Sequence, residues 1–111
     1  MAQTKATLFT SSQQQKAEIL KAMAHPARLA ILELLIQRRE CICGAIADTL
    51  PLAQSTVSQH LKALKEAHLI KGKTEGIQVC YCLDEEGINQ LNDLILPFIE
   101  QLNSSQKATC C

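Results

Sequence analysis

Residues 53–83 constrain the fold of this chain most strongly, because a helical pattern is followed there by two strand-like patterns. Apolar side chains recur every three or four residues in its first half, as in an amphipathic helix over about 53–67, at Val57, Leu61, Leu64 and Ala67. Two runs that favour strands follow, over 68–73 and 77–83, and a short loop containing Gly76 separates them. We therefore expect a helix followed by a β-hairpin.

Further helical patterns lie on both sides of this segment. We expect helices over about 13–23, 26–38, 43–50 and 85–103. Pro97 should kink or shorten the last of them. Pro51 and Leu52 make a tight connection between the third helix and the amphipathic one, as in a helix-turn-helix. The sequence thus predicts a mainly α fold with a β-hairpin, which is a winged helix-turn-helix.

The chain has 111 residues, which is the size of one ordinary domain. We expect a flexible N-terminal arm over 1–12, the folded domain over 13–103 and a flexible, cysteine-containing tail over 104–111. The last helix carries a long apolar stripe, and a chain this small gains burial by sharing a core with a second copy. These two features favour a homodimer.

The formal net charge of zero hides an asymmetry along the chain. The segment 53–75 has an excess of lysines, whereas 84–102 contains acidic residues and no Lys or Arg. Only the middle of the chain is therefore expected to face a polyanion, with the polar face of the 53–67 helix in the major groove of double-stranded DNA. The candidates for base or phosphate contact are Gln54, Ser55, Thr56, Ser58, Gln59 and His60. The candidates for phosphate contact are Lys62, Lys71 and Lys73.

The six cysteines occur as three close pairs, Cys41/Cys43, Cys80/Cys82 and Cys110/Cys111. The N-terminus lacks a signal-peptide pattern and no long apolar run is found, so we expect a cytoplasmic protein without a membrane span. Structural disulfides are rare in the cytoplasm, which favours metal ligands or redox sensors. Thiolates select soft, thiophilic ions.

The first two cysteine pairs lie in different predicted elements. We expect Cys41 and Cys43 at the start of the 43–50 helix, where the helix N-terminus and nearby arginines favour thiolate. Cys80 and Cys82 share one face of the second strand. We interpret that pair as incidental thiols, although a second ion site there stays open.

Three stretches resemble the ArsR/SmtB family of metal-responsive bacterial repressors: AHPARLAILELL (24–35), ECICGAIADTL with AQSTVSQHLKALKEAHLIKGKTEG (40–50 and 53–76), and IQVCYCL (77–83). The resemblance implies a homodimer that binds an imperfect palindrome in the promoter of a resistance operon. It also implies that an inducer releases the dimer from this operator, and that DNA binding itself needs no cofactor.

The resemblance also implies where the inducer binds. ECIC matches the family's thiol box, with Cys41 and Cys43 in the ligand positions. The commonest arsenic sensors have a third cysteine where this chain has Ile46, so Cys110 or Cys111 is expected to supply the third thiolate. The expected inducer is As(III), Sb(III) or a trivalent organoarsenical. Residues 84–102 contain no His, which argues against the family's zinc and nickel site.

Three alternatives remain open from the sequence. The cysteines could form a redox or persulfide switch in a repressor of the same fold. A cadmium or lead sensor is a second alternative, although residues 1–40 lack the cysteines that such sensors recruit. A thiol-rich metal buffer or oxidoreductase would leave the helix-turn-helix pattern unexplained. No catalytic constellation is evident, so we expect that the protein is not an enzyme.

Overall fold

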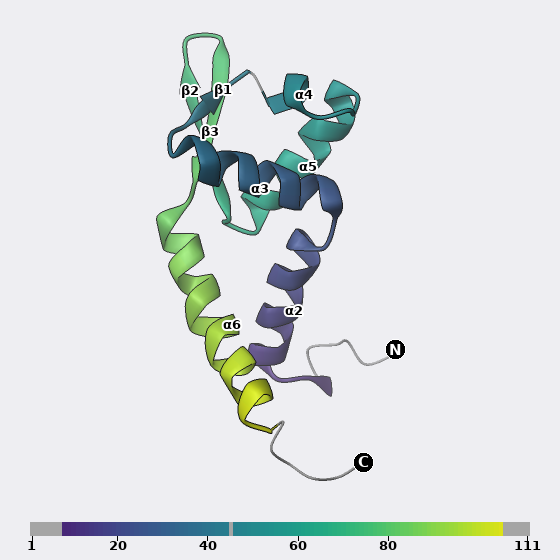
Figure 1. Cartoon of the computed structure of the whole chain (residues 1–111), viewed down its shortest axis with the longest axis vertical. Helices are drawn as coiled ribbons and strands as arrows, with labels where there is room; N and C mark the ends of the chain where they lie inside the picture. Colours follow the sequence, from purple (N-terminus) through teal and green to yellow (C-terminus); the bar gives the residue numbers. More distant parts are fainter. Residues whose placement is uncertain (1–7, 45, 106–111) are drawn as a thin grey trace.

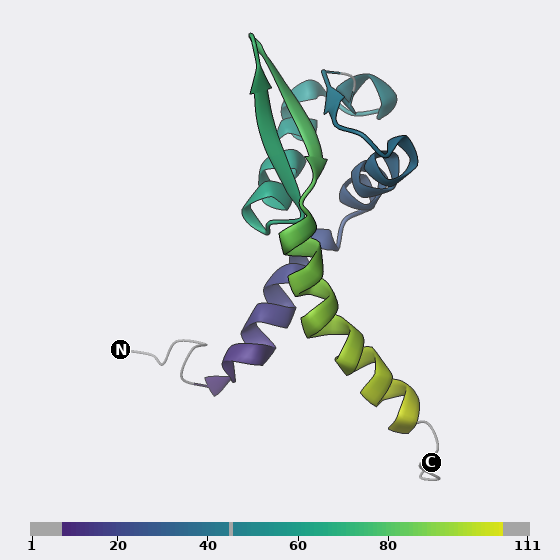
Figure 2. The same ribbon diagram turned by 90° about the vertical axis from the view of Figure 1, so that its left-hand side faces the viewer.

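The computed structural model describes residues 8–44 and 46–105. The elements in chain order are α2 (Ser11–Met23), α3 (Pro26–Arg38), β1 (Ile42–Cys43), α4 (Ile46–Thr49), α5 (Gln54–Glu66), β2 (Ile70–Glu75), β3 (Gln78–Leu83) and α6 (Glu85–Ser105). Helices α3, α4 and α5 lie together with the three strands, while α2 and α6 project from the same side of this unit (Figures 1 and 2). The predicted winged helix-turn-helix is confirmed.

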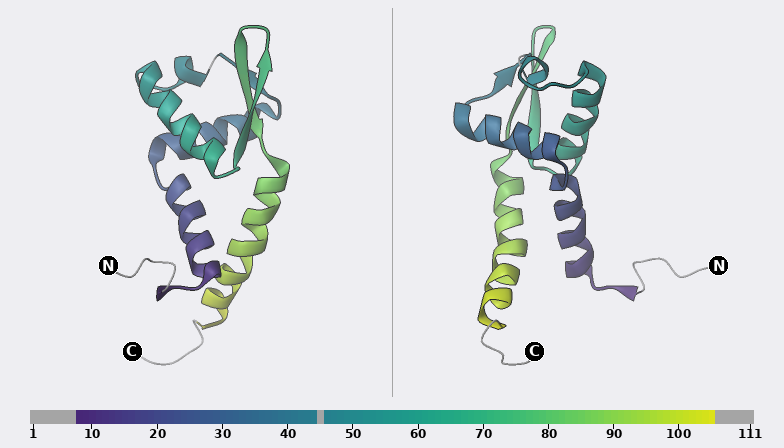
Figure 3. Two further views of the ribbon diagram at one scale, coloured as in Figure 1. Left: turned by 180° about the vertical axis from the view of Figure 1, so that it is seen from behind. Right: turned by 45° about the vertical axis from the view of Figure 1, so that its right-hand side comes forward.

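The three strands form one antiparallel sheet in the order β1-β3-β2. The hairpin β2–β3 is the wing, and α5 packs beside it, as seen from behind in Figure 3. The sequence predicted only these two strands. The third strand, β1, comes from the segment before the helix-turn-helix and pairs Ile42 with Tyr81 and Cys43 with Cys80.

The core lies between α3, α5 and the sheet. Apart from Cys80, its largest fully buried side chains are branched aliphatic ones, in keeping with the scarcity of aromatic residues. The buried cluster consists of Ile31, Leu32, Leu35, Ile42, Ile46, Val57, Leu61, Leu64, Leu69 and Ile70. Helix α3 is buried on one side only, since Leu29 and Ile36 are exposed. Apolar residues occur around most of α3, but those on its outer side are not covered within one subunit.

Local sequence explains where the first helices begin. Thr10 and Gln13 form a reciprocal capping box before α2. His25 caps α3 by accepting a hydrogen bond from the Ala27 N–H at 3.0 Å, and Pro26 takes the first helical position. The bounds predicted for α3 are confirmed.

The end of α5 meets the start of α6. His68 follows the C-cap of α5 with a φ of 61°, and the N–H groups of His68 and Leu69 donate to the carbonyls of Lys65 and Leu64. The Asp84 N–H then donates to the Leu69 carbonyl at 3.0 Å, directly before α6. This contact attaches α6 to the end of α5.

Helix α6 continues through Pro97 to Ser105, so this proline does not shorten the helix. Among its residues only Gly87 is buried, and apolar side chains at its far end are exposed. None of the helices within 8–44 and 46–105 is both long and apolar enough to cross a bilayer.

Candidate DNA interface and thiol site

The polar face of α5 is exposed to solvent. Most of the residues predicted to contact DNA lie on this face: Gln54, Ser55, Ser58, Gln59 and Lys62 are exposed, and Thr56 is half-buried. Val57, Leu61 and Leu64 anchor the opposite face in the core. The helix is therefore fixed on one side and free to enter a groove with the other.

The two predicted phosphate-binding residues of the wing are also accessible. Lys71 and Lys73 lie on β2, and both are exposed. The Lys73 ammonium lies 3.8 Å from the Glu75 carboxylate, with most of both side chains in solvent. An exposed pair of this kind contributes little stability, so Lys73 stays available to a phosphate.

His60 differs from the other DNA candidates because it is only 9% exposed. Its Nδ1 accepts a hydrogen bond from Nε of Arg28 at 3.1 Å, and its ring centroid lies 4.3 Å from that of His25. Arg28 also donates to the Ala22 carbonyl, so one guanidinium joins the end of α2 to α5. Burial, and then the charges of His25 and Arg28, lower the pKa of His60. In this position His60 braces α5 through Nδ1, and burial leaves only a small part of its ring accessible to DNA.

The cysteines of the thiol box do not lie at a helix start. Ile42 and Cys43 form β1, Gly44 follows with a φ of 73°, and α4 begins only at Ile46. The expectation that a helix N-terminus favours their thiolate form is therefore wrong. The Cys-Ile-Cys alternation directs the buried Ile42 to the core and both cysteines to the other face of the sheet.

Among the described residues, the structure has two disulfides, Cys41–Cys82 and Cys43–Cys80. They follow from the antiparallel register, which places the Cα atoms of the two pairs 4.3 and 4.0 Å apart. The expectation that disulfides are unlikely in this chain is contradicted, as is the interpretation of Cys80 and Cys82 as incidental thiols. Cys80 is only 1% exposed.

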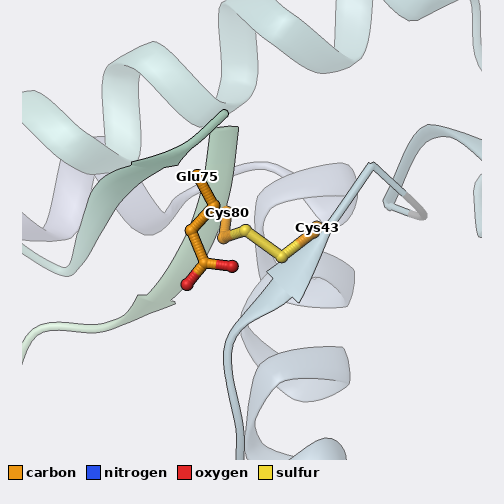
Figure 4. A group of neighbouring side chains, drawn as sticks. All are labelled: Cys43, Glu75 and Cys80. Carbon is orange, nitrogen blue, oxygen red and sulfur yellow. A yellow bond between two sulfur atoms is a disulfide. The ribbon is translucent and has the colours of Figure 1, made fainter. Parts of the chain in front are cut away.

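An acidic side chain lies at one end of this thiol cluster. Figure 4 shows Cys43 and Cys80 joined through their sulfurs, with Glu75 beside them. The Sγ atoms of the two cysteines and a carboxylate oxygen of Glu75 lie within 4.8 Å of one another. Cys41 and Cys82 form the other end and line a surface hollow of about 560 Å³.

Sequence reasoning missed two parts of this arrangement. One is the pairing of the two Cys-X-Cys motifs, for which the shared spacing of 41/43 and 80/82 was the available signal. The other is Arg28, whose part in holding His60 leaves no sequence signature. Cys110 and Cys111, predicted to supply a third thiolate, lie outside the described residues.

Comparison with known proteins places this geometry among transcriptional regulators. A family model described as a helix-turn-helix domain matches residues 23–72. An uncharacterized helix-turn-helix transcriptional regulator of Methanocaldococcus jannaschii is 36% identical over 74% of this chain and 92% of its own length. The transcriptional repressor SmtB of Mycobacterium tuberculosis is 41% identical, over 60% of this chain and 48% of its own.

A solved structure is similar over most of the fold. It is described as a possible transcriptional regulator for arsenical resistance. It superposes with a TM-score of 0.66 at 29% identity, covering 79% of this chain and 95% of the other. The similarity extends beyond the matched helix-turn-helix segment to most of the described residues.

Proposed function

The chain belongs to the ArsR/SmtB family of transcriptional repressors, and we propose that it represses a metalloid resistance operon as a cytoplasmic homodimer. In this proposal the dimer binds an imperfect palindrome. It leaves the DNA when As(III), Sb(III) or a trivalent organoarsenical binds cysteine thiolates that include Cys41 and Cys43.

The observation that carries the proposal is the position of the thiol cluster beside the DNA-reading helices. Cys43 ends β1, and α4 begins three residues later at Ile46. Helix α4 contacts α5, whose polar face is exposed. An ion held by Cys41 and Cys43 would therefore act directly on the segment that leads into the helix-turn-helix.

The dimer contact is proposed for the two helices that project from the domain. Helix α2 contacts α6, and α2 contributes no residue to the buried core. Several apolar residues on them are exposed, namely Leu20, Leu96, Phe98, Ile99 and Leu102. A second copy packed against these faces would bury them and fix the spacing of the two α5 helices for successive major grooves.

The test is release from DNA by thiophilic ions. An operator duplex is first selected from a random pool with the reduced protein, and binding is then followed by fluorescence anisotropy. As(III) or Sb(III) should weaken binding by about 5–150-fold, the usual range of allosteric coupling, and Zn(II) should have a smaller effect. A protein–DNA complex that persists under As(III), Sb(III) and Cd(II) would remove the metalloid-sensor function.

A second candidate function is supported by the two disulfides, which favour a thiol redox or persulfide-responsive repressor. The same duplex distinguishes it from the first candidate. A redox repressor should lose DNA affinity after peroxide or polysulfide treatment without any metalloid, and recover it with a reductant. If oxidised and reduced proteins bind DNA equally well, the redox function is excluded.

A further inference from the structure

We propose that Cys82 of the wing supplies the third thiolate of the inducer site, together with Cys41 and Cys43 of the same subunit. This inference rests on the proposed function, because it concerns the ion that releases the repressor. It places the whole site within the described residues of one chain, across the β1–β3 pair.

The first argument is the register of the sheet. Cys43 pairs with Cys80, so the same register sets Cys41 opposite Cys82, and the two disulfides confirm that both pairs face each other. All four side chains lie on one face because residues two apart in a strand share a face. Diagonal neighbours in such a pair are about 7–8 Å apart, so the short side chains of Cys43 and Cys82 can be joined only through an ion that lies between their sulfurs. Cys82 therefore lies opposite Cys41 and diagonal to Cys43.

The second argument is access, which separates Cys82 from Cys80. Cys41 and Cys82 line the hollow of about 560 Å³, with Leu35 and Ile88 among its apolar walls. Cys80 is only 1% exposed. An arsenic(III) centre with three sulfur ligands is pyramidal, and its lone pair needs an open side. The hollow supplies that side at Cys82, whereas the buried Cys80 does not line it.

Charged side chains lie at both ends of the thiol cluster. The Glu75 carboxylate lies with the sulfurs of Cys43 and Cys80, within 4.8 Å. Its negative charge opposes a second thiolate at that end of the cluster. At the other end, two cationic and two acidic residues line the hollow, namely Arg39, Lys71, Glu40 and Glu85. Lys73 pairs with Cys80, and its ammonium, 3.8 Å from the Glu75 carboxylate, offsets the charge of that carboxylate. Charge therefore does not decide between Cys80 and Cys82, and the assignment rests on register and access.

Arsenite binding to the three cysteines leaves the oxidation state of arsenic unchanged. Each disulfide is first reduced by two molecules of a low-molecular-weight thiol, which together donate two electrons and two protons and are joined as one disulfide. Arsenous acid then reacts with three cysteine thiols. Three As–O and three S–H bonds break, three As–S bonds form, and three molecules of water leave.

The experiment uses the full-length protein, reduced with a phosphine and desalted, with arsenite as the probe. X-ray absorption at the arsenic edge gives the number of sulfur ligands, and a titration gives the affinity. Cys82→Ser should lower the sulfur number from three to two. The affinity of this variant for arsenite should fall by more than about tenfold. Loss of a residue that only hydrogen-bonds to a metal ligand already lowers metal affinity by about 10–100-fold, and Cys82 is proposed as a ligand itself. Cys80→Ser is the matched control on the same strand and should keep three sulfurs.

Three sulfur ligands at arsenic in Cys82→Ser would overturn the proposal. Loss of a sulfur ligand only in Cys80→Ser, or only in the Cys110→Ser/Cys111→Ser double variant, would also overturn it. Alkylation of the wild-type protein with arsenite bound, mapped by mass spectrometry, avoids any folding defect. Cys41, Cys43 and Cys82 should then be protected. DNA release is scored separately. Three-sulfur binding without release would contradict the proposed function and leave the ligand assignment standing.

Discussion

Gly87 offers a direct test of how α6 is attached to the DNA-reading helix. It lies in the first turn of α6, where its N–H is 3.3 Å from the Asp84 carboxylate, and it is buried against the backbone of His68. A methyl group at this position would lie 2.6 Å from the carbonyl carbon of His68 and closer still to its oxygen. Since carbon atoms pack at about 3.5–4.0 Å, Gly87→Ala should force α6 away from the end of α5.

Two effects of opposite sign set the magnitude. Alanine gains about 1 kcal/mol over glycine in a helix interior, so without the contact the substitution would stabilise the protein. Overpacking costs about 1–3 kcal/mol, and here the obstructing atoms belong to the backbone, which places the cost at or above the upper end. We expect a net loss of about 2 kcal/mol, which would lower Tm by about 8–16 °C in a domain of this size.

The assay is urea and thermal unfolding of Gly87→Ala beside Asn92→Ala, an exposed position of the same helix. The control should be as stable as the wild type or more so, because alanine is the better helix former. Operator affinity should fall in Gly87→Ala alone, since α6 begins against the end of α5. Unchanged or increased stability of Gly87→Ala would refute the close approach of α6 to His68.

Three further outcomes are expected. Burial lowers the pKa of His60, so the unfolded state binds more protons than the folded state. The free energy of unfolding should therefore fall as the pH drops below about 6.5. Urea titrations of His60→Gln should show a weaker pH dependence in that window. Replacing Lys71 and Lys73 by Gln should reduce the slope of log K against log salt by about 3.6 in a homodimer, at about 0.9 per phosphate contact, while Lys21→Gln leaves it unchanged. Ile99→Glu, on the exposed face of α6, should convert the dimer to a monomer in sedimentation and weaken operator binding.

Local signals made most of the fold predictable. His25 and Pro26 define the start of α3, and the predicted range of that helix matches the observed one. The apolar period of α5 and the glycine between β2 and β3 likewise identify the recognition helix and the wing. Each of these signals lies in or directly beside the element that it specifies, so it can be recognised without knowledge of tertiary contacts.

The site was harder to predict because its geometry depends on a contact between distant segments. Strand β1 has only two residues, and its partner residues on β3 come almost forty positions later. An alternation as short as Cys-Ile-Cys cannot be distinguished from a helix start without that partner. The burial of His60 has the same origin, because Arg28 reaches it from another helix.

The sheet register also explains how one thiol cluster could respond to two different signals. Lys71 pairs with Cys82 and Lys73 with Cys80, so the proposed phosphate contacts share a face with the cysteines. A disulfide and a metalloid bridge would both fasten β1, which leads into the helix-turn-helix, to the wing strand beside these lysines. Release from DNA requires a coupling of only about 1–3 kcal/mol, which a change in wing position can supply. In both candidate functions a bond would join β1 to the wing strand and restrain the position of the wing. The functions differ in whether that bond is a disulfide or a metalloid bridge.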